Sequence, residues 1–145
     1  MLKIILICAA LLPCPAWTQS PPTPTEVASP SATPLDFREF FAGGEGELKP
    51  SAKLLGLAGR RVRLIGFMAR MEEPPDGAFY LCPRPVVCDE SGGGTGDLPV
   101  EAVLVMVPSA RGRKVPFVNR AVEVTGILSV GSDGAGSWPL RLQLD

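Results

Sequence analysis

Residues 57–70 constrain the fold more than any other part of the chain, because they alternate like a β-strand and carry a glycine at mid-strand. One face of this stretch presents Val62, Leu64, Gly66 and Met68. The opposite face changes from charged to apolar halfway along, whereas a strand in a half-solvated flat sheet keeps one polar face throughout. A long strand that bends at Gly66 and serves both halves of a small barrel accounts for the change.

Four further segments have strand character, at residues 78–81, 100–107, 121–130 and 140–144. Gly126 interrupts the third of these segments, as Gly66 interrupts residues 57–70. Five strands, two of them bent at glycine, predict an all-β fold, a small five-stranded barrel of the OB type. A small β-sandwich is the alternative. Residues 108–119 have little helix-forming character, so we expect a reduced barrel without the helix that this fold often carries there.

The N-terminus reads as an export signal followed by a spacer. Residues 1–20 combine Lys3 with an apolar run that is too short to span a bilayer, which is typical of a secretory signal peptide. Residues 21–34 are rich in Pro, Ser and Thr and predict a disordered linker. The folded domain is expected to cover residues 35–145. We expect its short helical lead-in to dock on the barrel through Leu35, Phe37, Phe40 and Phe41, with partner binding as the alternative.

The charge balance argues against nucleic acid as a partner. The chain has 14 Lys and Arg against 15 Asp and Glu residues, with a formal net charge of −1, and loss of Lys3 with the leader makes it more negative. Nucleic-acid binding rests on clustered positive charge. The chain also has no histidine, so the commonest general base and the commonest metal ligand are both missing.

The strand pattern of residues 57–81 is similar to that of a known group of proteins. Leu57-x-Gly59-x-x-Val62-x-Leu64-x-Gly66-Phe67-Met68, then Phe79-x-Leu81 and a cysteine-bearing loop, resembles a group of small exported bacterial proteins of unknown function. The similar region covers residues 54–145. The resemblance implies an OB-like core and a periplasmic location in a Gram-negative bacterium. Its matching positions are structural, so it carries over no catalytic residues.

The loop of residues 82–97 concentrates the candidate site residues, which are Cys82, Arg84, Cys88, Asp89, Glu90 and Asp97. A disulfide between Cys82 and Cys88 is the favoured interpretation, since export permits it and no other cysteine remains after the leader. Against it, two nearby prolines hold the chain extended and oppose a tight return. A metal site using both thiols and the carboxylates is the second reading. A redox pair is the third, with a spacing unlike the usual Cys-x-x-Cys.

A basic patch follows further along the chain, made of Arg111, Arg113, Lys114 and Arg120. Its ordinary meaning is solvated surface charge. The sharper interpretation is recognition of an anionic group.

No sequence pattern supports catalysis. Residues 92–96 (GGGTG) lack the Gly-Lys-Ser/Thr ending of a phosphate loop, and Ser91 and Ser109 have no histidine to activate them. We therefore expect a non-enzymatic, periplasmic binding module without a cofactor, acting on an unidentified protein or small ligand and spanning no membrane once the leader is lost. A metal-handling accessory protein that uses the Cys82 and Cys88 loop is the alternative.

Overall fold

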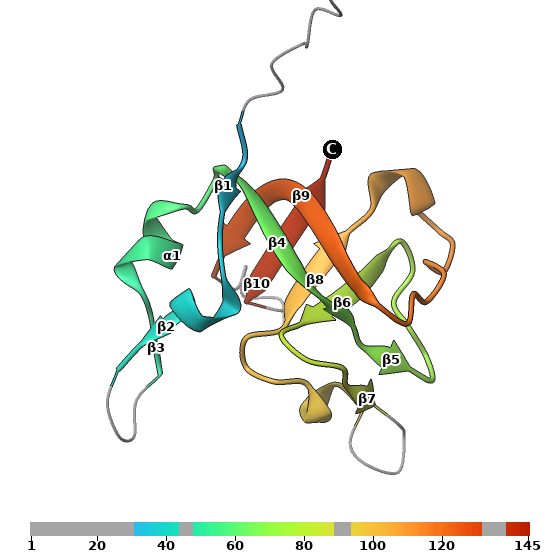
Figure 1. The fold of residues 1–145 in the computed structure, drawn as a ribbon. Coiled ribbons are helices and arrows are strands. Elements are labelled where there is room, and N and C mark those ends of the chain that lie inside the picture. Colours follow the sequence, from blue (N-terminus) through green and yellow to red (C-terminus); the bar gives the residue numbers. More distant parts are fainter. Residues whose placement is uncertain (1–30, 44–47, 89–93, 132–138) are drawn as a thin grey trace, which may run out of the picture.

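Five strands close into a barrel in the computed structural model, which describes residues 31–43, 48–88, 94–131 and 139–145 (Figure 1). The barrel strands are β4 (Arg61–Met68), β6 (Ala78–Cys82), β8 (Val103–Met106), β9 (Ala121–Val130) and β10 (Leu140–Leu144). They pair in the order β4-β6-β8-β10-β9, and β9 returns to pair with β4. All of these pairs are antiparallel except β8 with β10, which is parallel. The predicted five-stranded OB-like barrel is confirmed, and the β-sandwich is excluded.

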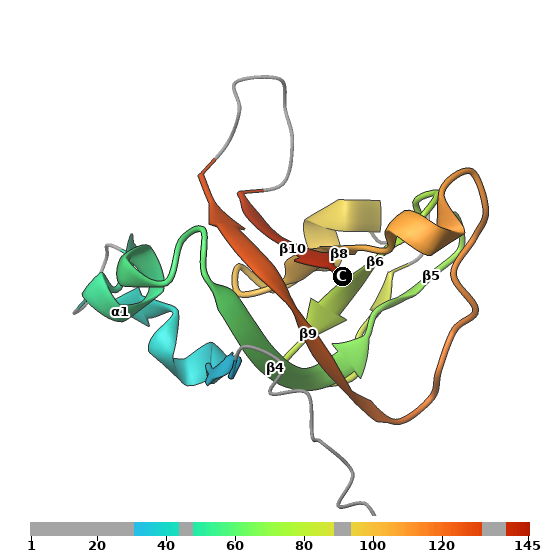
Figure 2. The ribbon, with the colours of Figure 1, turned by 90° about the horizontal axis from the view of Figure 1, so that it is seen from above.

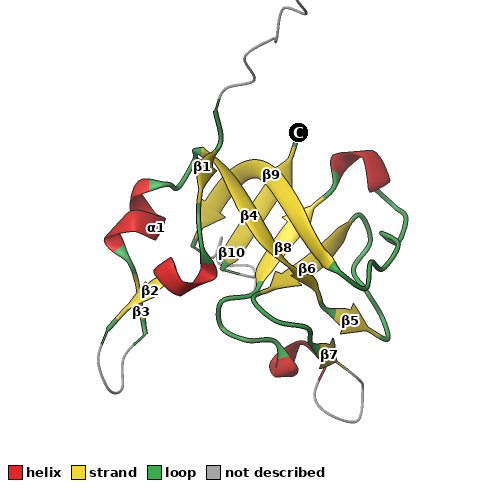
Figure 3. Ribbon diagram, viewed as in Figure 1, coloured by secondary structure: helices red, strands yellow, loops and turns green. Residues whose placement is uncertain are grey.

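Smaller elements surround the barrel (Figure 3). They are β1 (Thr33–Pro34), η1 (Phe37–Glu39), β2 (Phe41–Ala42), β3 (Lys49–Pro50), α1 (Ala52–Gly56), β5 (Arg70–Met71), β7 (Val87–Cys88), η2 (Gly94–Asp97) and η3 (Pro108–Ala110). The connection between β8 and β9 contains only the single turn η3 and otherwise runs without regular structure. The expected loss of a helix at this position is therefore confirmed.

Two glycines lie where the barrel strands change partners. β4 pairs with β9 as far as Phe67 and with β6 at Phe67 and Met68, so Gly66 lies at the changeover. A Cβ on Gly66 would lie 2.7 Å from the carbonyl oxygen of Cys82 and 2.9 Å from the Phe37 ring. Gly126 pairs with strands on both sides, and a Cβ there would overlap the carbonyl oxygen of Gln143. Both glycines are required by close approach of neighbouring groups.

The N-terminal segment packs against one side of the barrel, with α1 at its outer edge (Figure 2). Leu35, Phe37, Phe40 and Leu54 are buried in the same cluster as the inward-facing barrel residues. The rings of Phe37 and Phe40 lie 5.0 Å apart between centroids. Burying an aromatic side chain contributes about 1.5–3 kcal/mol. The predicted docking of this segment is confirmed, although Phe41 is only partly buried.

Local capping explains how this segment turns. Asp36 caps η1 by accepting a hydrogen bond from the backbone N–H of Arg38, and Glu39 accepts one from the N–H of Asp36. Ser51 caps α1 by accepting a hydrogen bond from the N–H of Leu54. Lys53 pairs with Glu39 at 2.6 Å and so joins α1 to η1. This capping positions Leu54 on the buried face of α1.

The chain joins the barrel slightly before the expected domain start. β1 pairs in parallel with β4, and Thr33 lies opposite Val62. β8, by contrast, begins at Val103, later than the predicted strand, because residues 100 and 101 form a turn. The predicted signal peptide and residues 21–30 of the predicted linker lie outside the described residues.

Candidate ligand-binding site

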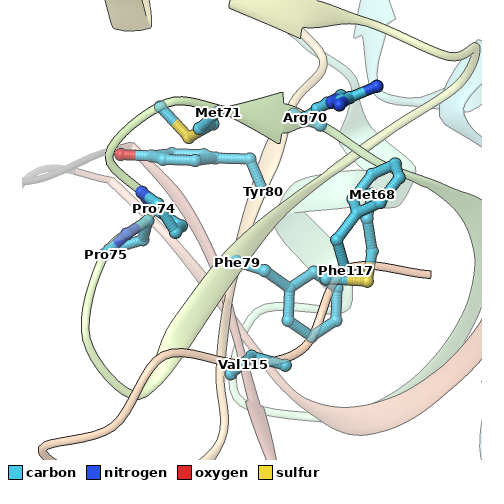
Figure 4. Close-up of a pocket in the computed structure, with 10 residues that line it drawn as sticks. Met68, Arg70, Met71, Pro74, Pro75, Phe79, Tyr80, Val115 and Phe117 are labelled. Atoms are coloured by element: carbon cyan, nitrogen blue, oxygen red, sulfur yellow. The ribbon is translucent and has the colours of Figure 1, made fainter. Parts of the chain in front are cut away.

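An apolar pocket lies where the β4–β6 turn meets the β8–β9 connection, and its cavity volume is about 320 Å³ (Figure 4). Its lining comes from three separate stretches of sequence. The residues are Met68, Ala69, Arg70, Met71, Pro74, Pro75, Phe79, Tyr80, Val115 and Phe117. Small-molecule sites typically measure roughly 300–1,000 Å³ and combine apolar walls with a few polar groups. The pocket has the size and character of a site for a small apolar ligand.

Core residues and strand ends form two sides of this pocket. Met68 and Phe79 are almost fully buried and belong to the barrel core. Tyr80 and Met71 are partly buried and face away from that core (Figure 4). The N–H of Ala69 donates to the carbonyl of Tyr80, which holds the end of β4 against β6. The barrel itself therefore fixes these sides.

The remaining wall depends on contacts between two loops. The N–H of Gly77 donates to the carbonyl of Arg113, and Asp76 forms an isolated β-bridge with Lys114. The Lys114 ammonium lies 3.0 Å from the Asp76 carboxylate and also donates to the carbonyl of Pro74. Gly77 has φ of +63°, a left-handed conformation that favours glycine. These contacts position Val115 and Phe117 opposite Pro74 and Pro75.

A second apolar cluster lies directly behind Tyr80 and Met71. It consists of the buried residues Ala69, Cys82, Cys88, Leu98 and Ala102, with Met71, Tyr80 and Val86 packed against it. Burial, with a smaller contribution from Cys88, raises the pKa of the Tyr80 hydroxyl above its ordinary value. Tyr80 therefore stays neutral at physiological pH, and its ring separates the pocket from the cysteine cluster.

No disulfide joins Cys82 and Cys88 in the structure, so the disulfide expected from the sequence is not formed there. Cys82 ends β6 opposite Phe67, whereas Cys88 lies in β7 beside Met71 of β5. The two prolines between the cysteines lead the chain from one strand to a different strand. This agrees with the expectation that they hold the chain extended and oppose a tight turn between the cysteines.

Burial also governs the reactivity of Cys82. It raises the pKa of the Cys82 thiol to about 12, with the charge of Cys88 adding to the rise and Arg84 opposing it. Metal binding and nucleophilic attack both require the thiolate. Cys82 is protonated near neutral pH, which makes it a packing residue in this conformation.

Of the other predicted loop residues, the structure describes Arg84 and Asp97. Arg84 is exposed and Asp97 is exposed in η2. Asp89 and Glu90 lie outside the described residues. Within the described ranges, no group of three or more Cys, Asp or Glu side chains lies close enough together to hold a metal ion.

The predicted basic patch is divided by the fold. Lys114 is engaged by Asp76, and Arg113 donates to the carbonyl of Ser109 at 2.7 Å. Arg111 lies beside Gly77 in a separate hollow. Arg120 lines a different hollow beyond Phe117. The four cations therefore do not converge on one anion.

No sequence pattern indicated that Tyr80 and Phe117 would share a pocket. One signal could have found part of the site. Residues 115–118 (VPFV) form an apolar island in an otherwise basic, polar connection. An apolar island in a loop indicates that the loop packs against something.

Comparison of the chain with known proteins gives no assignment, because neither the protein-family models nor the curated proteins yield a match. Across the described parts of the chain, no helix has the length and apolar character needed to cross a membrane.

Proposed function

We propose that this protein is a non-enzymatic binding module, exported to the periplasm of a Gram-negative bacterium, that holds a small apolar ligand in the pocket beside Tyr80 and Phe117. The apolar pocket of about 320 Å³ is the observation that carries this proposal. Export is supported by the leader-like residues 1–20, and the Gram-negative setting by the resemblance of residues 54–145 to small exported proteins.

The chemistry of the pocket lining supports binding over catalysis. The described lining residues supply thioether, aromatic, aliphatic, proline and guanidinium groups. None of them is a carboxylate, a thiol or a serine or threonine hydroxyl, which are the usual nucleophiles and general bases. Tyr80 is the one titratable acid among them, and burial raises its pKa further from neutrality. Such a lining excludes water from a bound apolar ligand and holds that ligand in position.

Titration with the neutral fluorescent dye N-phenyl-1-naphthylamine tests the proposal. We expect saturable binding to protein released by osmotic shock, with residues 1–20 absent from that material. Phe117 is 45 % exposed and its ring borders the pocket, so Phe117→Ala should weaken dye binding about fivefold, or about 1 kcal/mol.

The matched control is Ile65→Ala, which removes an apolar side chain that is 59 % exposed on β4 and does not line the pocket. This control should bind the dye as the unmodified protein does. Equal loss in both variants, or the absence of saturable binding, would contradict the proposed site. Recovery of the protein only from the cytoplasm, with Met1 intact, would contradict export.

A further inference from the structure

A second hollow, with a volume of about 100 Å³, adjoins the apolar pocket. The two share Met68, Arg70 and Phe117 as lining residues, so the Phe117 ring borders both. The far side of the second hollow is formed by residues 85–87, which follow β6, and by residues 118–120, which precede β9. The second hollow therefore lies next to the apolar pocket, with Phe117 between them.

This second hollow brings two guanidinium groups to the mouth of the pocket. Arg70 lines both cavities, and Arg120 lines the second one. The Arg70 side chain extends away from Pro74 and Pro75, on the side where Met68 and Phe117 lie (Figure 4). Both arginines are exposed. Arg70 belongs to β5 and Arg120 directly precedes β9, so the two are far apart in sequence.

Neither arginine has a carboxylate partner within the described ranges, although other cations there do. Lys53, Arg61, Arg63 and Lys114 are among the described cations that form ion pairs. The described residues that line the two cavities include no Asp or Glu. Among the described residues, neither guanidinium is therefore held in an ion pair, although Glu72 lines a neighbouring hollow together with Arg70. A guanidinium presents a planar fork of donors that matches carboxylate, sulfonate or phosphate oxygens.

We propose that the pocket selects small amphipathic anions, whose apolar body fills the cavity beside Tyr80 and whose anionic group lies between Arg70 and Arg120. This inference rests on the proposed binding function and adds the chemical class of the ligand. Exposure of both arginines means that their charge is partly screened by solvent, so the expected contribution of each is modest. The apolar body supplies most of the affinity, and the anionic group supplies the selectivity.

A matched pair of dyes tests the inference. N-phenyl-1-naphthylamine and 1-anilinonaphthalene-8-sulfonate share the same aromatic body, and only the second carries a sulfonate. We expect the sulfonate dye to bind at least fivefold more tightly in low salt. Raising the ionic strength should weaken its binding and leave the neutral dye unaffected, because salt screens exposed charges.

Arginine variants locate the effect. Arg120→Gln should weaken binding of the sulfonate dye threefold to tenfold and change binding of the neutral dye less than twofold. Arg70 also lines the apolar pocket, so Arg70→Gln should weaken binding of the sulfonate dye at least threefold more than it weakens binding of the neutral dye. Arg38→Gln removes the same charge from η1, outside both cavities, and should change neither. Circular dichroism of each variant verifies that the fold is retained.

The outcomes separate this inference from the function on which it rests. If the neutral dye binds saturably but the sulfonate dye binds no more tightly, and neither arginine variant alters it, the anion selectivity is wrong while the pocket stands. If Arg38→Gln weakens the sulfonate dye as much as the other two variants, net charge alone explains the preference and the inference is overturned. If neither dye binds, both the pocket and its selectivity are overturned.

Discussion

At the residue scale, Gly66 matters for packing because it has no side chain. Gly66 is the residue that permits β4 to lie against both Cys82 and Phe37, and its conformation does not need a positive φ. The sequence predicted a bend at this glycine. It could not show that the space above Gly66 is filled by Phe37, which lies in a separate segment. Gly66 thus serves the docking of the N-terminal segment as well as the barrel.

Replacing Gly66 tests this role. In Gly66→Ala the new methyl would lie 2.7 Å from a backbone oxygen that cannot move without disturbing β6. We expect the free energy of unfolding to fall by about 2–3 kcal/mol, as for overpacked cores, measured by urea denaturation. Gly56→Ala is the matched control, since a Cβ there meets nothing within 4 Å and α1 gains a better helix former. It should be neutral or stabilising by up to about 1 kcal/mol, and a loss of stability as large as that of Gly66→Ala would refute the packing explanation.

At the scale of elements, the N-terminal segment is part of the domain's core. The sequence shows Leu35, Phe37 and Phe40 as a short apolar pattern. Their docking was predictable because so short a segment can bury these side chains only against the barrel. The elements that form the candidate site were not predictable. The β8–β9 connection has no periodicity of its own, and its path is set by Lys114, Asp76 and Gly77, whose contacts join distant parts of the chain.

Truncation of a docked side chain measures how much this segment contributes. Phe40 is fully buried, so Phe40→Ala should lower the free energy of unfolding by about 3–5 kcal/mol. Leu55→Ala, which shortens a side chain that is 54 % exposed on α1, should change it by less than about 0.5 kcal/mol. Urea denaturation followed by circular dichroism gives both values. A Phe40→Ala variant as stable as Leu55→Ala would mean that the segment does not contribute to the core.

At the scale of the whole molecule, the barrel and the candidate site follow from different kinds of information. Alternation and mid-strand glycines are local, so the five strands and their closure could be predicted. The pocket is assembled from residues 68–80 and 115–117, and no local pattern reports that these meet. The cysteine spacing suggested a disulfide that is not formed, for a related reason. Cys82 and Cys88 belong to different strands and pack in a cluster with Leu98 and Ala102.

We propose that the cavity between the β4–β6 turn and the β8–β9 connection is a ligand site. Nitrogen-15 NMR spectra recorded during titration with N-phenyl-1-naphthylamine test it most directly, because they report on every backbone amide at once. We predict that the largest chemical-shift changes fall at Ala69, Met71, Tyr80, Val115 and Phe117, and that α1 is unaffected. Saturating changes centred on α1 and η1, or uniformly small changes without saturation, would contradict the account.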